Sequence, residues 1–226
     1  MRLLAIDTAL QACAAAVFDT DLDEVVAHES VAMQRGHAEA LMPLIARVMD
    51  RAETEFSSLD RVAVTVGPGS FTGLRVGIAA ARGIALTAAK NAVGVSTLAA
   101  YAAPCIAADL AETTIVAIDA RHDHVYLQVF GPGGRTLVPA SYASIAEALT
   151  LAEGEVHLAG SAAHLLEAQW PAERPKPFRR PDAAAPDIAW VARLGAAADA
   201  KFAPAKPLYL RPPDARPQDG ARLPRQ

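Results

Sequence analysis

The chain repeats a short apolar motif at about half its length, and this repeat limits the folds it can adopt. The first copy reads Leu-Ala-Ile-Asp and ends at Asp7; the second reads Val-Ala-Ile-Asp and ends at Asp119, 112 positions later in a chain of 226 residues. A break and a second apolar segment follow each copy, at residues 12–18 and 125–130. The repeat indicates two similar halves, and we place the boundary between them near residue 110.

Both halves show the same order of predicted elements. Apolar runs separated by turn residues predict three strands in a meander, then a helix, a strand and a second helix. In the first half the three strands are predicted at residues 2–7, 12–18 and 24–31, the helix from residue 37, the next strand at residues 62–66 and the second helix from residue 71. A further strand at residues 92–95 and a helix at residues 97–108 follow. In the second half the three strands are predicted at residues 115–119, 125–130 and 137–138, the helix at residues 144–151 and the next strand at residues 156–159. A last helix is predicted after it, capped by Gly160 and Ser161. The pattern predicts an α/β fold of two lobes.

A glycine-rich turn and the helix after it form the most distinctive stretch. Gly67-Pro-Gly69 predicts a tight turn, and the side chain of Ser70 or Thr72 is expected to cap the helix. One ridge of that helix is almost bare backbone, with apolar side chains beside it: Gly73, Gly77, Ala81 and Ala85, next to Leu74 and Ile78. Glycine inside a helix costs about 0.5–1 kcal/mol relative to alanine, so another backbone should pack closely against this ridge. The sequence leaves open whether that backbone belongs to the lobe's own sheet or to another subunit.

The same turn resembles a phosphate-binding loop, but its spacing does not match. A P-loop needs a lysine after its last glycine, and this stretch has none. The dinucleotide fingerprint needs its third glycine one position earlier than Gly73. We therefore expect the turn to serve the fold rather than a nucleotide.

Composition and charge restrict the class of protein. The chain is 52% hydrophobic and 5% aromatic, and its net charge is −4. Residues 1–170 carry a net −9 and residues 171–226 a net +5, so the body should not bind nucleic acid by itself. No apolar run is long enough to span a bilayer, and no signal peptide is recognised, so we expect a cytoplasmic protein that does not contact membranes. Cys13 and Cys105 read as buried, reduced thiols.

The C-terminal quarter differs in composition, because residues 171–226 hold 11 of the 16 prolines. A helix is predicted within residues 186–200 and a last ordered patch at 207–211, with disorder from Pro212 onward. The expected domains are a first lobe at 1–110, a second lobe at 111–203 and a proline-rich tail at 204–226.

Several polar side chains are candidates for chemistry. Asp7, Thr8, Asp119 and Arg121 end the first strand of each repeat, and they either line a nucleotide cleft between the lobes or cap their own turns. A helical metal site would need a histidine four residues after His37, and that position is Leu41, so no metal site is expected. His122 and His124 are read as surface or cleft histidines, whose role stays open. Ser70 does not lie in a hydrolase motif, so a helix cap is the simpler interpretation.

Five motifs together resemble the TsaB family, also called YeaZ: residues 5–8, 35–37, 67–77, 118–121 with Tyr126, and 209–211. The resemblance runs from the N-terminus to about residue 211, and its most specific part is the glycine-rich stretch. It implies the duplicated actin-like, sugar-kinase-like (ASKHA) fold, which agrees with the internal repeat. It also implies a bacterial partner and paralogue of TsaD, the tRNA threonylcarbamoyl transferase.

The resemblance further implies a non-catalytic subunit. The TsaD metal would be held by two histidines on one helix, and here the second is Leu41. The resemblance implies pairing with TsaD through helices of the first lobe, with expected interface residues Leu41, Ile45, Phe71, Gly73, Leu74, Gly77, Ile78 and Ala81. A homodimer is expected when TsaD is absent, and tRNA is expected to be contacted indirectly. ATP·Mg, a TsaE-like ATPase and the TsaD-bound metal belong to the assembled complex. The alternatives are a self-sufficient ATPase or phosphotransferase that uses Asp7 and Asp119, and a peptidase acting on TsaD.

Overall fold

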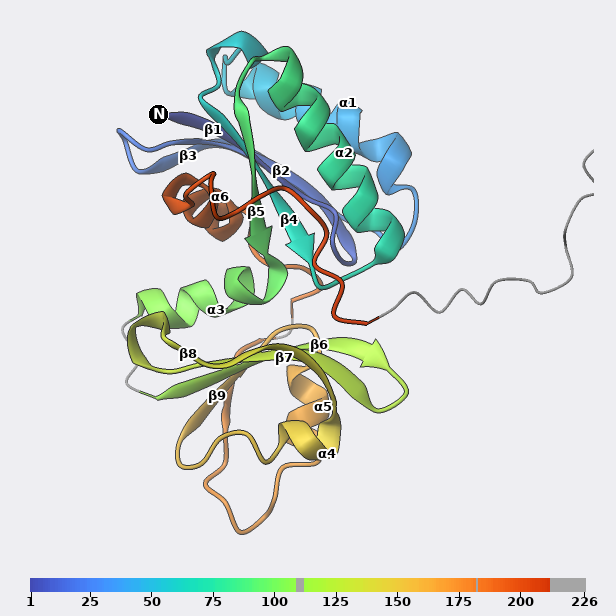
Figure 1. The fold of residues 1–226 in the computed structure, drawn as a ribbon, viewed down its shortest axis with the longest axis vertical. Coiled ribbons are helices and arrows are strands. Elements are labelled where there is room, and N and C mark those ends of the chain that lie inside the picture. The colour runs from blue at the N-terminus through green and yellow to red at the C-terminus, as the bar shows by residue number, and fades with distance from the viewer. Residues whose placement is uncertain (109–111, 182, 212–226) are drawn as a thin grey trace, which may run out of the picture.

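In a computed structural model, which describes residues 1–108, 112–181 and 183–211, the chain forms two lobes (Figure 1). The first lobe holds a five-stranded sheet in the order β3-β2-β1-β4-β5, and the second a five-stranded sheet in the order β10-β9-β6-β7-β8. The strands of the first sheet are β1 (Arg2–Asp7), β2 (Ala12–Asp19), β3 (Glu24–Ala32), β4 (Arg61–Gly67) and β5 (Asn91–Ser96). Those of the second are β6 (Thr113–Arg121), β7 (His124–Phe130), β8 (Thr136–Ser144), β9 (Val156–Ala159) and β10 (Phe178–Arg179).

The two sheets correspond strand by strand. In each, the first three strands pair antiparallel as the predicted meander, and the fourth and fifth run parallel beside the first. The duplicated two-lobe α/β fold predicted from the repeat is therefore confirmed.

The helices lie in layers around the two sheets. They are α1 (His37–Arg51), α2 (Phe71–Thr87), α3 (Thr97–Ala107), α4 (Ile145–Ala148), α5 (Ala163–Ala168) and α6 (Ile188–Ala197), with short 3₁₀ turns η1 (Phe56–Ser58) and η2 (Pro132–Gly134). In Figure 1, α1 and α2 cover one face of the first sheet and α6 covers the other. Helix α3 packs on the second sheet between the lobes, and α4 and α5 cover the far face. No helix in the described ranges is long and apolar enough to cross a membrane.

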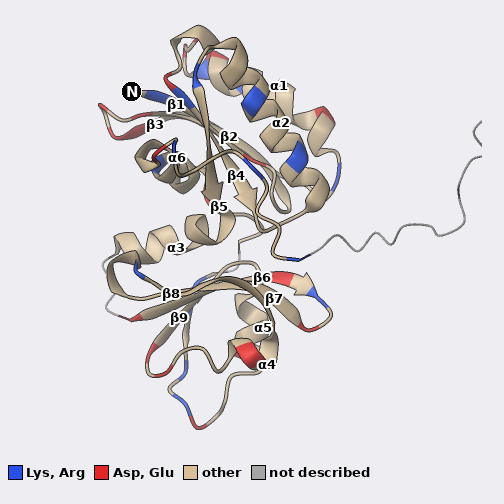
Figure 2. Ribbon diagram, in the orientation of Figure 1, with Lys and Arg blue, Asp and Glu red and all other residues tan. Residues whose placement is uncertain are grey.

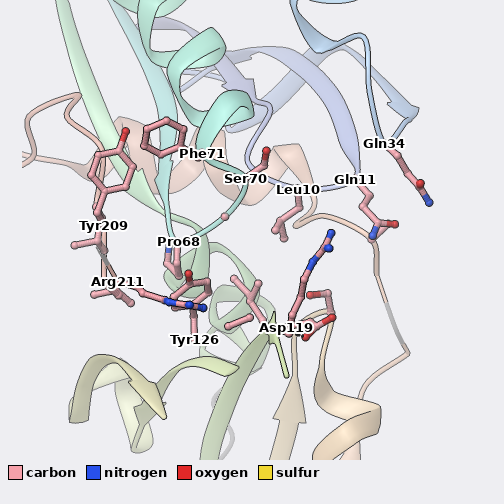
Figure 3. Close-up of a pocket in the computed structure, with 18 of the residues that line it drawn as sticks. Leu10, Gln11, Gln34, Pro68, Ser70, Phe71, Asp119, Tyr126, Tyr209 and Arg211 are labelled. Atoms are coloured by element: carbon pink, nitrogen blue, oxygen red, sulfur yellow. Dashed lines mark hydrogen bonds between the residues drawn. The ribbon is translucent and has the colours of Figure 1, made fainter. Parts of the chain in front are cut away.

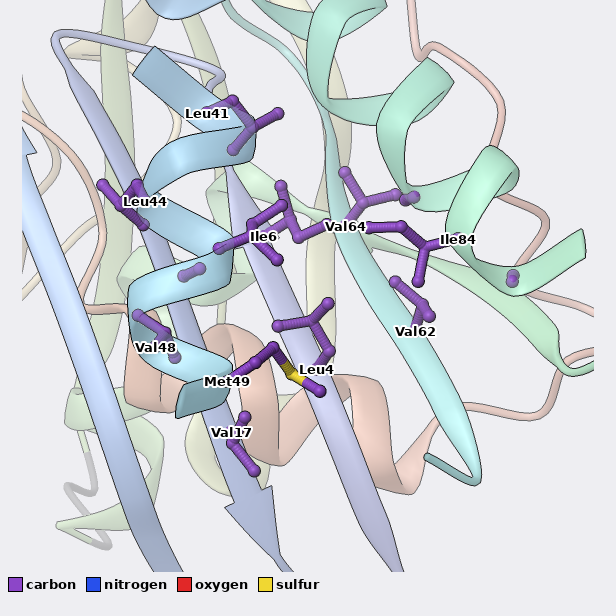
Figure 4. Close-up of a cluster of buried hydrophobic side chains, with 14 of the residues drawn as sticks. Leu4, Ile6, Val17, Leu41, Leu44, Val48, Met49, Val62, Val64 and Ile84 are labelled. Carbon is purple, nitrogen blue, oxygen red and sulfur yellow. The ribbon is translucent and has the colours of Figure 1, made fainter. Parts of the chain in front are cut away.

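Alternation along β1 and β4 sets how closely each helix approaches the first sheet. Leu4, Ile6 and the large valines of β4 point toward α1 and α2 (Figure 4). The opposite face carries alanines, including Ala63. A Cβ added to Gly195 of α6 would lie 2.2 Å from the Cβ of Ala63, so α6 packs against the sheet at backbone distance. Because successive side chains of a strand point to opposite faces of the sheet, large side chains cover the face toward α1 and α2, and small ones cover the face toward α6. We call the alanine-rich face the shallow face.

Helix α6 belongs with the first lobe, which corrects the expected lobe boundaries. Its apolar side packs on β1, β2 and β4 rather than on the second sheet. The guanidinium of Arg61 donates to the carbonyl oxygens of Gly195, Ala196 and Ala198 at 2.9, 3.0 and 2.6 Å, at the end of α6. The second lobe therefore ends before α6, not at residue 203, because the shallow sheet face needs this cover.

The segment after α6 also packs on the first lobe. We call residues 203–211 the C-terminal strap. The carbonyl oxygen of Ala203 accepts from the N–H of Gly94 at 2.9 Å, and the N–H of Leu208 donates to the carbonyl oxygen of Val66 at 2.7 Å. The expected tail therefore begins as part of the first lobe; its predicted disorder from Pro212 falls outside the described residues.

Helix caps and element lengths agree with the sequence predictions in some places and differ in others. Ser70 caps α2 by accepting from the N–H of Gly73 at 3.3 Å, as expected. The expected cap at Gly160 and Ser161 is wrong, since α5 has Ala162 at its N-cap and no side-chain cap. The helix predicted at 144–151 is the single turn α4, and β8 is longer than its predicted two residues.

Candidate functional site

A pocket of about 1190 Å³ lies between the lobes, and we call it the interlobe pocket. The first lobe lines it with the β1–β2 turn, the segment leading into α1 and the turn before α2. The second lobe adds the end of β6, and the strap adds another wall. Side chains from all these parts are labelled in Figure 3: Leu10, Gln11, Gln34, Pro68, Ser70, Phe71, Asp119, Tyr126, Tyr209 and Arg211.

Asp7 lies inside the first lobe and not in this pocket. Its Oδ1 accepts from the hydroxyl of Thr65 at 2.5 Å and from the N–H of Ala9 at 2.9 Å. Its Oδ2 is buried and has no hydrogen-bond partner among the described residues. Burial raises the pKa of Asp7, and the Thr65 and Ala9 hydrogen bonds and the nearby His37 oppose this rise. The expectation that Asp7 lines a cleft is corrected: it caps its own turn, the second of the two readings that the sequence allowed.

Thr8 also faces inward, against the glycine-rich helix. Its hydroxyl donates to the carbonyl oxygen of Gly73 at 2.7 Å. A Cβ on Gly77 would lie 2.3 Å from the Thr8 Oγ1, and one on Gly69 would lie 2.3 Å from the carbonyl oxygen of Ala9. The glycines are therefore needed because the β1–β2 turn presses against the start of α2.

The bare ridge of α2 is consequently sealed within its own lobe. The ridge and its apolar neighbours are buried, as are the two α1 residues expected at an interface: Gly73, Leu74, Gly77, Ile78, Ala81, Leu41 and Ile45. These side chains pack against β1, β2 and β4, because their own sheet supplies the close backbone. The expected partner interface is corrected on this point, and only Phe71, 41% exposed, lies on the surface.

Asp119 and Arg121 do line the interlobe pocket. The Asp119 carboxylate accepts from the backbone N–H of Arg121 at 2.7 Å, so it also caps its own turn. Arg121, His122 and Asp123 have φ values of 66°, 53° and 57°, a left-handed run of three residues without glycine. Such a backbone is costly for residues with a Cβ, so the tip of the β6–β7 hairpin is strained.

His37 is held by the backbone. Its Nε2 lies 3.1 Å from the carbonyl oxygen of Leu10, to which it donates in the tautomer that carries the proton there. Position 41, one turn further along α1, is a leucine in the core. No group of three or more His, Cys, Asp or Glu side chains placed to hold a metal occurs in the part of the chain that the structure describes.

His122 and His124 are not pocket residues. The Nδ1 of His124 lies 2.6 Å from the carbonyl oxygen of His122, and its ring stacks on Tyr142 with centroids 4.8 Å apart. On the same cluster, the guanidinium of Arg211 lies 5.4 Å from the Tyr142 ring centroid. The strap therefore reaches the second lobe at its last described residue.

The strap is the part of the site that the sequence did not predict as functional. The ring of Tyr209 lies 5.4 Å from that of Phe71, and its hydroxyl accepts from the Nε of Arg75 at 3.2 Å. Figure 3 shows Tyr209 and Arg211 on one side of the pocket, across from Gln11 and Gln34. The Tyr-Leu-Arg motif at 209–211 was visible in the sequence, but its return to the pocket depends on the path of α6.

The surfaces of α1 and α2 turned away from the sheet form a second feature, which we call the outer helix face. It carries Leu86, which is 80% exposed, Met42, which is 48% exposed, and the small residues Ala79 and Gly83. A hollow of about 390 Å³ lies on it between Arg75 and Arg82. Figure 2 shows basic residues on both helices. The sequence pattern of α2 contains this face, on the side of the helix opposite the ridge that led to the interface prediction.

Comparison with known proteins gives a consistent family. Residues 24–185 match the family model described as TsaD: tRNA N6-adenosine threonylcarbamoyltransferase. The chain is 37% identical over 126 residues to the "tRNA threonylcarbamoyladenosine biosynthesis protein TsaB" of Escherichia coli strain K12, a match that covers 56% of this chain and 53% of that protein. This chain thus spans about half the length of that relative.

Other matches cover nearly the whole chain. The uncharacterized protein Rv3421c of Mycobacterium tuberculosis is 36% identical over 220 residues, covering 95% of this chain and 94% of that one. The structure of YeaZ from Pseudomonas aeruginosa matches with a TM-score of 0.70 and 27% identity, over 92% of this chain and 99% of that one. A polyphosphate/ATP-glucomannokinase from Arthrobacter sp. strain KM matches with a TM-score of 0.53 and 12% identity, over 87% and 98% of the chains, which shows a shared fold alone.

Proposed function

We propose that this chain is a non-catalytic subunit in tRNA threonylcarbamoyladenosine biosynthesis. The proposal starts from its family, because the chain belongs to the TsaB (YeaZ) family and more broadly to the family of the TsaD model. In this proposal a TsaD-like partner transfers the threonylcarbamoyl group to the adenosine next to the anticodon. ATP·Mg, a TsaE-like ATPase and the catalytic metal are assigned to the rest of the complex.

The observation that carries the proposal is that the polar groups suited to chemistry are used inside the first lobe. Asp7 is enclosed and hydrogen-bonded to Thr65, and Thr8 to Gly73; His37 lines the interlobe pocket, but its Nε2 is engaged by the carbonyl oxygen of Leu10. A self-sufficient ATPase or phosphotransferase of this fold would need carboxylates that reach its cleft to hold Mg²⁺. Asp119 alone of the two predicted aspartates lines the pocket, which supports the subunit proposal over that alternative.

The docking surface in this proposal is the outer helix face rather than the sealed ridge. An exposed leucine beside Ala79 and Gly83 allows the backbone of a partner helix to approach closely. An interface of this kind would bury about 800 Å² on each side, and Arg75 and Arg82 would suit an acidic rim on the partner. The same face would form the homodimer when the partner is absent.

The experiment compares two exposed leucines in co-purification with a TsaD-like partner. Leu86→Asp places a charge on the outer helix face, and Leu22→Asp places one on the β2–β3 turn, where Leu22 is 67% exposed. We expect Leu86→Asp to abolish co-purification and modification of tRNA by the reconstituted complex, while Leu22→Asp behaves as the unchanged chain. Equal retention of partner and activity by both variants would overturn the docking surface. Modification of tRNA by the complex without this chain would overturn the subunit role.

A further inference from the structure

The C-terminal strap has an anchored start and an exposed end. Ala205 is buried in the core of the first lobe, and Pro204 bridges to the edge strand β5. Further on, the N–H of Leu208 donates to a carbonyl oxygen of β4 at 2.7 Å, but the side chain of Tyr209 is 44% exposed. A segment with few buried contacts separates from the fold at a smaller free-energy cost than the core does. The end of the strap, residues 207–211, is therefore the part that can detach alone.

Two cationic side chains hold this end between the lobes. On the first lobe, the guanidinium carbon of Arg75 lies 3.7 Å from the ring centroid of Phe71, and its Nε donates to the hydroxyl of Tyr209 at 3.2 Å. On the second lobe, the guanidinium carbon of Arg211 lies 5.4 Å from the ring centroid of Tyr142. In Figure 3, Tyr209 lies beside Phe71 and Arg211 extends toward the second lobe. The last residues of the strap thus connect helix α2 with strand β8.

Arg75 also lines the hollow of about 390 Å³ on the outer helix face, together with Arg82 and Pro207. Arg82 makes no ion pair with any residue in the described ranges, so its charge is available there. Two guanidinium groups beside one hollow suit a carboxylate, which accepts charge-assisted hydrogen bonds. A carboxylate is a stronger acceptor than the neutral hydroxyl of Tyr209, so an acidic group bound here would compete for the Nε of Arg75.

We propose that residues 207–211 form a releasable clasp between the lobes, and that an acidic group bound between Arg75 and Arg82 releases it. Release begins when Arg75 turns from Tyr209 toward the acidic group, which removes the side-chain hydrogen bond between the clasp and α2. Docking on the outer helix face would thereby free the second lobe from the strap. The inference rests on the proposed function in one respect, because the TsaD-like partner is the expected source of the acidic group. The clasp itself depends on this chain alone.

The first test measures amide hydrogen exchange at Leu208 by NMR in the full chain, because this N–H is bonded to β4 while the clasp is closed. Arg75→Ala and Tyr209→Phe should each speed the exchange by roughly two- to tenfold, since both remove the hydrogen bond between the two side chains. Arg82→Ala is the matched control and should leave the exchange unchanged, because Arg82 lines the same hollow without a hydrogen bond to the strap. Unchanged exchange in both Arg75→Ala and Tyr209→Phe would overturn the clasp.

The second test asks whether the clasp opens as one unit. Arg211→Ala removes the contact with Tyr142 on the second lobe. It should speed exchange at Leu208 by roughly two- to fivefold, as expected for the loss of one exposed cation–π contact. Lys206→Ala is the control, because Lys206 is an exposed cation just before the clasp. Exchange at Leu208 that responds to Arg75→Ala but not to Arg211→Ala would show that the strap does not link the lobes.

The third test titrates hexaglutamate into the full chain, with hexaglutamine as the uncharged control. Hexaglutamate should speed exchange at Leu208 to the level seen in Arg75→Ala, and Arg82→Ala should weaken this response. The absence of a response at roughly 10 mM, or an equal response to hexaglutamine, would overturn release by an acidic group.

Co-purification with the TsaD-like partner tests the proposed function separately. Retention of the partner without a response to hexaglutamate leaves the subunit role standing and removes this inference. A response to hexaglutamate without retention of the partner does the reverse.

Discussion

The hydroxyl of Thr8 donates a hydrogen bond of 2.7 Å to the carbonyl oxygen of Gly73, which joins the β1–β2 turn to the first turn of α2. The two backbones lie so close that a Cβ on Gly73 would be 2.1 Å from the carbonyl oxygen of Thr8. The glycine-rich stretch therefore stabilises the interior of the first lobe, and its helix presents a different face to solvent.

Gly73→Ala should lower the free energy of unfolding by about 1–3 kcal/mol, because the methyl group has no room and the two segments must separate. Gly83 is the matched control in the same helix, since a Cβ there meets nothing within 4 Å. Gly83→Ala should raise the free energy of unfolding by up to about 1 kcal/mol through helix propensity alone. Urea unfolding of the three proteins measures both effects. Equal stability of Gly73→Ala and the unchanged chain would contradict the close packing.

The buried Asp7 should make the protein less stable as the pH rises. Burial raises the pKa of Asp7 above the unfolded value of 3.8, so the folded state holds the proton more tightly than the unfolded state. The contribution of Asp7 to stability is complete below 3.8 and is lost as the pH rises through the folded pKa, with a slope of at most about 1.4 kcal/mol per pH unit.

Asp7→Asn removes this titration, so the stability of the variant relative to the unchanged chain should improve as the pH rises above 3.8. Urea midpoints from acid to neutral pH measure the difference. Asp119→Asn is the control, because Asp119 is exposed. Parallel curves for the unchanged chain and Asp7→Asn would show that the carboxyl group does not titrate differently on folding.

Arg61→Ala should destabilise the first lobe by about 2–3 kcal/mol, since three carbonyl oxygens at the C-terminal end of α6 lose a charged donor. Arg82→Ala, on the outer helix face, should change stability by less than about 0.5 kcal/mol. Hydrogen exchange in α6 should rise in Arg61→Ala and stay unchanged in Arg82→Ala. If exchange in the second sheet rose instead, the assignment of α6 to the first lobe would be wrong.

Asp123→Gly should stabilise the protein by about 0.5–1 kcal/mol, because glycine adopts the φ of 57° at the hairpin tip without steric cost. The substitution leaves the backbone carbonyl of residue 123 free to accept from Ile145 as before. Asp123→Ala keeps a Cβ and should bring no gain. Thermal unfolding of the two variants distinguishes relief of strain from the simple loss of a surface charge.

The sequence predicted the order of elements well because the signals were local. The strand at β1 matches its predicted residues, and β2 and β4 match within a residue, since β-branched and apolar runs end at clear turn residues. The short strand β10 was missed because two residues carry no periodicity. The cap expected from Ser161 failed because the helix starts two residues later, after Gly160 takes a positive φ.

The site was harder to predict because its geometry depends on contacts distant in sequence. Nothing around Asp7 distinguishes a carboxylate that faces a cleft from one that faces Thr65, 58 positions later. Helix α6 has an ordinary apolar stripe, and the sequence does not say which sheet it covers. Asp119 and Arg121 line the pocket from the end of a strand that the sequence predicts, whereas the third wall, with Tyr209 and Arg211, follows only from the path of the strap.

The return of α6 to the first sheet has a consequence for synthesis on the ribosome. Strands β1 to β5 emerge early, but the alanine-rich side of their sheet has no cover until residues 188–197 leave the exit tunnel. The N-terminal half of the molecule can therefore complete its native packing only after the second sheet has been made. A nascent chain halted before α6 would expose that side to chaperones.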